Sequence, residues 1–384
     1  MSKKKQNRPE KQRALLLYMA GDNDLSDAGM RDVVELCREG GNDELYIGIE
    51  IDTDGLRTGS IRYEITAPEP MPNGKRRAHR KVIERLEERD SGKPETLLAF
   101  IKWGLSMFPA SETVVVIGGH GSGFRGGNRS IAVDYNGSAI EMDELSLVFH
   151  RAKLQNNPIA LLGFDACLMG MLEVAHHISP YAKHLICSQE VEPADGWPYD
   201  RVLKNLKTKD EIDIVAKNIA GSYIDYYKRN IHLSITQSVI DLAATGAAME
   251  ALGALGETLV RALRAAKADG ASLQGKIERA RSIALSFHDA EYVDVVHLAE
   301  ELSKVFPNSE TAKACDVLRR ATKDAIIENK VPTRSKALAN ANGLSVWFPP
   351  TKFSWIVARS KYLKMSGVRL YPCLLYTSPS PRDS

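Results

Sequence analysis

The sequence lacks any apolar run close to the ~20 residues that a membrane-crossing helix needs. It has only five cysteines in 384 residues, and none of them forms a Cys-x-x-Cys pair. This usage is typical neither of a disulfide-stapled domain nor of a zinc site, and we expect no metal site. Lys and Arg number 51 against 49 acidic residues, so the formal net charge of +2 gives no global preference for nucleic acid or an anionic membrane.

Both ends of the chain are expected to be disordered. Residues 1–13 form a basic arm that resembles the start of a signal peptide. The apolar run after it is short, however, and ends in Gly-Asp-Asn-Asp without a small-residue cleavage site. We therefore expect a cytoplasmic protein, or a secreted one if a leader was removed. Residues 373–384 have no core-forming pattern and read as a disordered tail that could derive from cloning.

Between these ends, short apolar runs alternate with helical patterns. The expected strands are Ala14–Ala20, Leu45–Ile51, Thr113–Ile117, Ala160–Phe164, His184–Ser188 and Leu233–Ile240. The expected helices are Asp27–Glu39, Pro94–Phe108, Glu141–Leu154, Leu168–Ile178 and Lys209–Tyr227. This alternation predicts an α/β core over 14–240 with a mostly parallel sheet flanked by helices. Residues 241–372 predict a C-terminal helical subdomain, with an added strand at 343–348.

Two segments contain the candidate catalytic residues. One buried strand runs into Gly-Gly-His120-Gly, and another runs into Asp165-Ala-Cys167. Ligands of parallel α/β sheets bind at the carboxyl ends of strands, so we expect His120 and Cys167 to meet although 47 residues separate them. A thiolate is the attacking form of cysteine, and an imidazole can take the thiol proton. The N-terminal dipole of a helix opening at Cys167 would favour the thiolate further.

Neighbouring groups complete this hypothesis. The backbone N–H groups of Gly121 and Cys167 could hold the oxyanion of a tetrahedral intermediate. Asp165 shares a strand face with Cys167, and its carboxylate would favour a substrate with Arg or Lys before the scissile bond. The alternative for Asp165 is to cap the helix that follows.

Four strings, in order along the chain, resemble the clostripain family of cysteine peptidases: LLLYMAGDNDL, FIKWGLSMFPASETVVVIGGHGSG, FDACLMG and SQEVEPADGWPYD. With the later SVWFPP segment, the resemblance covers roughly residues 14–350. It implies a caspase-like fold, a dyad of His120 and Cys167, and cleavage of peptide or protein substrates after Arg or Lys. It places acidic residues of the pocket for that side chain, the S1 pocket, at Asp165 and Asp195.

The resemblance leaves several properties open. Some family members cut themselves, and Arg125 and Arg129 in the glycine-rich loop are candidate cleavage sites. Some depend on Ca²⁺, although no EF-hand loop is present. The oligomeric state is unknown.

Two other functions are compatible with parts of the sequence. The run from Gly121 to Gly126 matches a dinucleotide-binding fingerprint, but no helix opens within it, so we reject that function. The alternative from another class is a non-catalytic or zymogen-like scaffold with the same fold.

Overall fold

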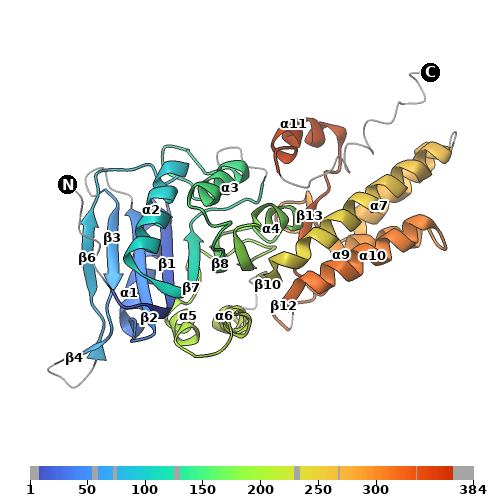
Figure 1. Cartoon of the computed structure of the whole chain (residues 1–384). Helices are drawn as coiled ribbons and strands as arrows, with labels where there is room; N and C mark the ends of the chain where they lie inside the picture. Colours follow the sequence, from blue (N-terminus) through green and yellow to red (C-terminus); the bar gives the residue numbers. More distant parts are fainter. Residues whose placement is uncertain are drawn as a thin grey trace.

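A twisted nine-stranded sheet forms the centre of the computed structural model, which describes residues 8–53, 59–71, 76–124, 130–228, 234–266, 269–333 and 335–365 (Figure 1). In spatial order its strands are β12 (Ile326–Lys330), β10 (Gln237–Asp241), β9 (Ala182–Cys187), β8 (Ile159–Asp165), β7 (Ala110–Gly118), β1 (Lys11–Gly21), β2 (Leu45–Thr53), β3 (Ile61–Ile65) and β6 (Arg80–Arg85). The strands from β9 to β2 run parallel, and those at both edges pair antiparallel. The expected mostly parallel α/β sheet is confirmed.

The central strands are buried on both faces. In β1, Leu16 and Tyr18 pack into one apolar cluster, and Leu15 and Leu17 pack into a second cluster on the opposite face. A strand covered on both sides reads as a continuous apolar run, which is why these strands were visible in the sequence.

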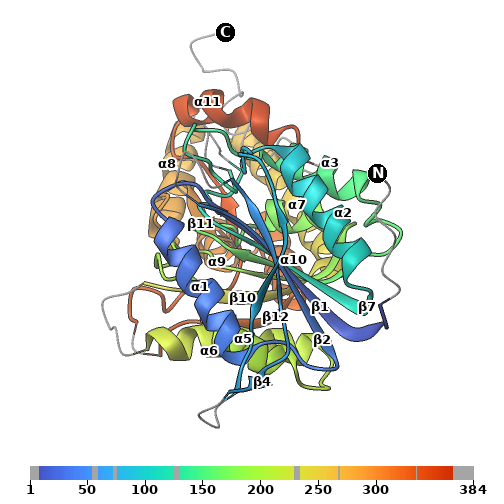
Figure 2. The ribbon, with the colours of Figure 1, turned by 90° about the vertical axis from the view of Figure 1, so that its left-hand side faces the viewer.

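Helices cover the two faces. On one side lie α1 (Ser26–Glu39), α5 (Tyr199–Leu206) and α6 (Ile212–Tyr227), and on the other α2 (Pro94–Met107), α3 (Met142–Arg151) and α4 (Leu172–Ile178). Figure 2, which looks along the sheet from its β6 edge, shows α1, α5 and α6 on one side of the strands and α2 and α3 on the other.

The sheet begins earlier than the boundary at residue 14 suggested. β1 starts at Lys11, and Arg13 is buried. Its guanidinium pairs with Glu112 at 2.7 Å and donates to the carbonyl oxygen of Thr208 at 2.6 Å. Residues 11–13 of the expected arm are therefore part of the core, while residues 1–7 lie outside the described ranges.

The C-terminal part is mainly helical but continues the central sheet. Its elements are α7 (Thr245–Ala265), α8 (Gly270–Ile283), α9 (Val295–Val305), α10 (Glu310–Ala325) and α11 (Lys352–Tyr362), with a 3₁₀ turn at Leu242–Ala244. Because β12 pairs with β10, residue 240 does not separate two independent units. The strand expected near 343–348 exists as β13 (Ser345–Trp347), but it pairs with β11 (Tyr292–Asp294) in a small separate sheet. Residues 366–384 lie outside the described part.

The strands β3 and β6 were not expected. They form a hairpin-like edge whose loop carries two short strands, β4 (Glu69–Pro70) and β5 (Arg76–Arg77). β6 is mostly exposed and rich in charge, so it lacks the apolar run that marks a central strand.

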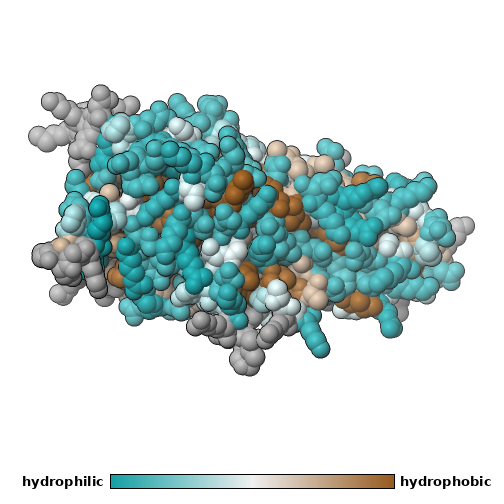
Figure 3. All heavy atoms as spheres, turned by 90° about the horizontal axis from the view of Figure 1, so that it is seen from below, coloured by the Kyte–Doolittle hydropathy of each residue, from teal (hydrophilic) through white to brown (hydrophobic). Residues whose placement is uncertain are grey.

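Within the described ranges, no helix is both long and apolar enough to cross a bilayer. The face seen in Figure 3 is mostly hydrophilic, with small hydrophobic areas toward its middle.

A buried glutamate ties the C-terminal segment to α4. Glu173 accepts hydrogen bonds from Trp347 N at 2.8 Å and from the Tyr362 hydroxyl at 3.4 Å. Burial raises the pKa of Glu173 to about 7, and the bond from Trp347 N only partly offsets this. The folded protein therefore keeps a proton that the unfolded chain has already lost.

We expect Glu173→Gln to gain stability relative to wild type as the pH rises from 5 to 8. Between the ordinary pKa and about 7 the native state binds the extra proton, so this group's contribution to the free energy of unfolding falls with pH, by on the order of 3 kcal/mol. Urea unfolding at both pH values measures the difference, and Glu257→Gln on the exposed side of α7 is the control. An equal pH response of Glu173→Gln and wild type would contradict the prediction.

Candidate functional site

The parallel pairing of β7 and β8 brings together the segments that contain His120 and Cys167. Gly118 at the end of β7 is in register with Asp165 at the end of β8, and Gly119 N donates to the carbonyl oxygen of Asp165 at 3.2 Å. The next residues of both strands leave the sheet at the same edge. His120 and Cys167 consequently line one cavity of about 210 Å³.

The turn at Cys167 differs from the expectation. α4 begins only at Leu172, with Met171 as its N-cap residue, so Cys167 does not open a helix and Asp165 does not cap one. Both sequence-based expectations are wrong. The reason is Leu168, whose φ of +62° takes the chain out of helical geometry directly after the cysteine.

Backbone groups of the loop after β9 hold this turn. Leu168 N donates to the carbonyl oxygen of Glu190 at 3.2 Å, and Gly170 N donates to that of Ser188 at 2.7 Å. The thiol of Cys167 receives a hydrogen bond from Glu192 N at 3.2 Å and lies 3.8 Å from the carbonyl oxygen of the same residue.

The pKa of the Cys167 thiol is raised in this environment. Burial is the main cause, and the charges of Asp165 and Glu190 add to it, while the N–H of Glu192 acts in the opposite direction. The thiol is therefore mostly protonated at neutral pH, and a base is needed to activate it.

His120 is oriented by a carboxylate. Its Nε2 lies 2.6 Å from Asp24 Oδ1, and the imidazole is 38% exposed. This hydrogen bond is the main cause that lowers the pKa of Asp24. A carboxylate at Nε2 favours the tautomer with the proton on that nitrogen, which leaves Nδ1 as a proton acceptor.

Gly121 lies against the cysteine turn. A Cβ atom at this position would come within 2.7 Å of the carbonyl oxygen of Cys167 and 2.9 Å of the Ala166 side chain, so the approach requires glycine. The close contact agrees with an oxyanion site between Gly121 and Cys167, which stays a prediction.

Asp165 lines the cavity and is itself nearly buried. Its Oδ2 accepts hydrogen bonds from the Tyr199 hydroxyl at 2.8 Å and from Trp197 N at 3.2 Å. Gly196 reaches it with a φ of +58°, where a Cβ atom would be 2.9 Å from Oδ1. Burial raises the pKa of Asp165, and the hydrogen bond from Tyr199 is the largest opposing effect.

Two more acids that the sequence did not reveal line the same cavity, Asp32 from α1 and Glu192 from the loop after β9. Burial and then the charge of Asp165 raise the pKa of Asp32 to about 9. The same two causes raise the pKa of Glu192 well above its ordinary value. Asp32 lies within a hydrophobic helical stripe, so the sequence pattern did not mark it as a site residue. Glu192 lies in a loop, where no periodic pattern indicates which side chains point inward.

Asp195, expected in the pocket, does not line the cavity in the described structure. Its side chain is 61% exposed and pairs with Arg31 at 2.8 Å. The candidate cleavage sites Arg125 and Arg129 lie outside the described residues.

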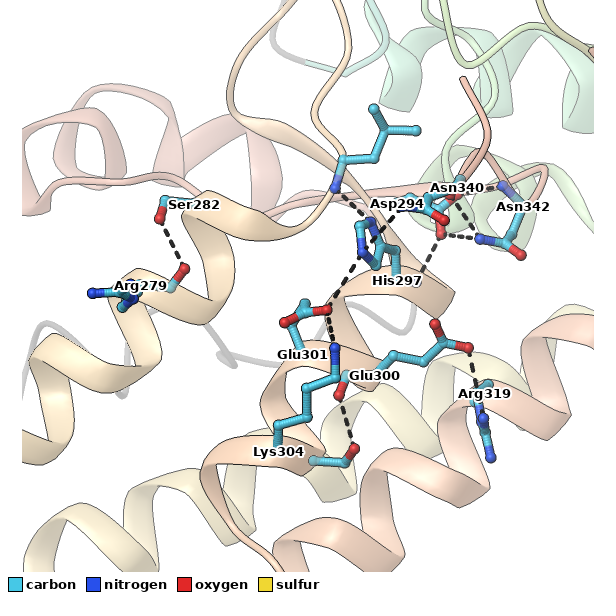
Figure 4. Close-up of polar contacts among 12 residues, drawn as sticks. Arg279, Ser282, Asp294, His297, Glu300, Glu301, Lys304, Arg319, Asn340 and Asn342 are labelled. Atoms are coloured by element: carbon cyan, nitrogen blue, oxygen red, sulfur yellow. Dashed lines mark hydrogen bonds and ion pairs between the residues drawn. The ribbon is translucent and has the colours of Figure 1, made fainter. Parts of the chain in front are cut away.

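The loop after β9 is anchored by the C-terminal region. Asp294, at the start of α9, accepts hydrogen bonds from the Gln189 side chain at 3.1 Å and from Asn342 N at 2.6 Å. Figure 4 shows Asp294 and Asn342 side by side near His297, whose backbone N–H donates to Asp294. Gln189 also accepts from Gly343 N at 2.8 Å. The C-terminal region thus fixes the loop that contacts Cys167.

No group of three or more His, Cys, Asp or Glu side chains is placed to hold a metal ion within the described ranges.

A sequence model of the clostripain family matches residues 17–362. The chain belongs to the clostripain family. It is 34% identical over 148 residues to clostripain of Hathewaya histolytica, a match that covers 33% of this chain and 27% of that protein. The alignment thus spans about a quarter of the curated relative's length.

Solved structures of this family share the fold. A secreted cysteine protease of Bacteroides thetaiotaomicron in complex with an irreversible peptide inhibitor superimposes with a TM-score of 0.71 at 18% identity, covering 95% of this chain and 99% of that one. An inactive zymogen protease of Parabacteroides distasonis gives 0.67 at 19% identity, covering 94% and 98%. The caspase-like fold expected from the family resemblance is confirmed. The expected cytoplasmic location gains no support, since the first of these proteases is secreted.

For the clostripain-family thiol Cys167, alkylation by iodoacetamide is expected to be slow at pH 7 and to accelerate as the pH rises past the ordinary thiol pKa, because burial disfavours the thiolate. Mass spectrometry of the peptide that contains Cys167 measures the rate at each pH. The Cys167→Ala variant identifies labelling of other cysteines. Rapid alkylation at pH 6 would instead indicate a preformed thiolate and contradict the raised pKa.

Proposed function

We propose that this chain is a cysteine endopeptidase that cleaves peptide or protein substrates after Arg or Lys, with Cys167 as nucleophile and His120 as general base. The observation that carries the proposal is a single cavity lined by His120, Cys167 and four acidic residues, Asp24, Asp32, Asp165 and Glu192. Family membership supports the peptidase chemistry.

The hydrogen bond between His120 and Asp24 supports the roles proposed for the dyad. With the proton held on Nε2, Nδ1 of His120 accepts the thiol proton as the sulfur attacks the scissile carbonyl carbon. The N–H groups of Gly121 and Cys167 bind the resulting oxyanion. Collapse of the intermediate breaks the C–N bond, and the imidazolium protonates the leaving amine. Water, deprotonated by the same imidazole, then hydrolyses the thioester and releases the thiol.

The acids of the cavity account for the proposed preference. A guanidinium or ammonium group of the substrate that enters the cavity meets Asp165, close to the nucleophile. The hydroxyl of Tyr199 and the N–H of Trp197 fix that carboxylate in place. A buried carboxylate binds a cation well, and an uncharged side chain could not compensate its negative charge.

Cys167→Ala is expected to abolish hydrolysis of all peptides, and Asp165→Asn to lower kcat/KM for peptides with Arg or Lys before the scissile bond. Loss of one member of a buried charge pair costs about 2–5 kcal/mol, or roughly 30- to 5,000-fold. Matched fluorogenic peptides with Arg, Lys, Leu and Asp at that position measure both effects, with and without Ca²⁺.

The contrasting outcomes separate the alternatives. Equal turnover of Leu and Arg peptides would contradict the basic preference. If the wild type hydrolyses none of the peptides, the zymogen-like or non-catalytic scaffold is favoured.

Self-processing is proposed at Arg125 or Arg129. The residues that flank this segment, Phe124 and Ser130, are both buried. We expect wild-type protein to be cut after one of these arginines and Cys167→Ala protein to stay intact. Intact-mass measurement of both preparations tests this, with Arg125→Gln/Arg129→Gln as the control for the site. A wild type that remains uncut while hydrolysing peptides would contradict it.

A further inference from the structure

Asp32 occupies a distinctive place among the acids of the cavity. It lies on α1, only 7% exposed, and lines the same cavity as Asp165 and Cys167. Ala28 and Gly29 line the cavity from the same helix, and Leu25, its N-cap residue, lines it as well. These positions recur every three to four residues, so one stripe of α1 faces the cavity. Asp32 is the acidic residue of this stripe.

The hydrogen-bonding state of Asp32 differs from that of Asp165. Asp165 is already bonded to Tyr199 and Trp197. For the Asp32 carboxylate, the structure over its described ranges gives no hydrogen bond or ion pair. The neighbouring cation, Arg31, is directed to Asp195 instead. A nearly buried carboxylate without a partner is costly, and a substrate cation would remove this cost.

We propose that Asp32 is the second substrate-binding carboxylate of the cavity and that it selects Arg over Lys. The proposal rests on the proposed function. A guanidinium has five N–H donors in a planar fork and can bond to Asp165 and to Asp32 together. The ammonium of Lys is a compact point charge that binds one carboxylate well and the other less so.

Asp32→Asn keeps the shape of the side chain and removes the charge. We expect kcat/KM to fall about 10- to 100-fold for Arg peptides, the loss of one hydrogen bond between charged groups, and clearly less for Lys peptides. Leu peptides should respond no more than Lys peptides. Asp27→Asn, an exposed residue of the same helix, is the matched control, and Asp195→Asn tests the acid that the sequence suggested.

The outcomes are decisive for Asp32. Equal losses for Arg and Lys peptides, or a larger loss in Asp195→Asn than in Asp32→Asn, overturn the proposal. If the wild type cleaves no basic peptide at all, the proposed function fails. If the wild type cleaves Arg peptides and Asp32→Asn is unchanged, only the role of Asp32 fails.

A binding measurement gives a second readout that a purely structural role would not change. The groups that influence Asp32 are Asp165, Glu35, Arg31 and Asp195, and the empty cavity keeps Asp32 protonated at neutral pH, since its pKa is raised to about 9. A peptide ending in Arg should ionise it and release its proton. Calorimetry of that peptide with Cys167→Ala, in two buffers of different ionisation enthalpy at pH 7.5, should show about one more proton released than with Cys167→Ala/Asp32→Asn. Equal proton release would overturn the proposal.

Discussion

The parallel register between β7 and β8 is the constraint on which the site depends. Because Gly118 and Asp165 are directly paired, the strands end together and deliver His120 and Cys167 to one edge of the sheet. A slip of one residue would turn Asp165 to the opposite face, away from Tyr199 and Trp197. The apolar burial of both strands on two faces fixes this register, so packing far from the chemistry determines the geometry of the site.

The central strands could be predicted because the apolar run of each strand is visible in its own short stretch of sequence. A run such as Ala14–Ala20 is apolar throughout, and only a sheet covered on both sides explains it. The edge strands β3 and β6 and the start of α4 depend instead on strand pairing and backbone conformation, which the residue pattern does not show. β6 is held mainly by its pairing with β3, and the late start of α4 follows from the left-handed conformation of Leu168, which no helical propensity predicts.

The approach of His120 and Cys167 to one cavity could be predicted for the same reason as the strands that precede them, whereas the other lining residues depend on tertiary packing. Asp24 reaches His120 from the segment after β1, and Asp32 comes from a neighbouring helix. Asp195 and Glu192 stand three positions apart in one loop, yet only Glu192 faces the cavity. Sequence identifies such a loop, but the backbone turn at Gly196 and the bonds to Cys167 decide which side chain points inward.

An acidic cavity beside Cys167, the proposed nucleophile, presents an electrostatic conflict, because negative charge disfavours the thiolate. The fold reduces this conflict by burial, which raises the pKa of Asp32, Asp165 and Glu192. Asp32, whose pKa is raised to about 9, holds its proton in the empty cavity at neutral pH and exerts little repulsion on the sulfur. When a substrate cation enters, the acids can ionise against it, and the added positive charge offsets the negative charge that the thiolate would otherwise meet. Burial thus makes a pocket for cations compatible with an anionic nucleophile.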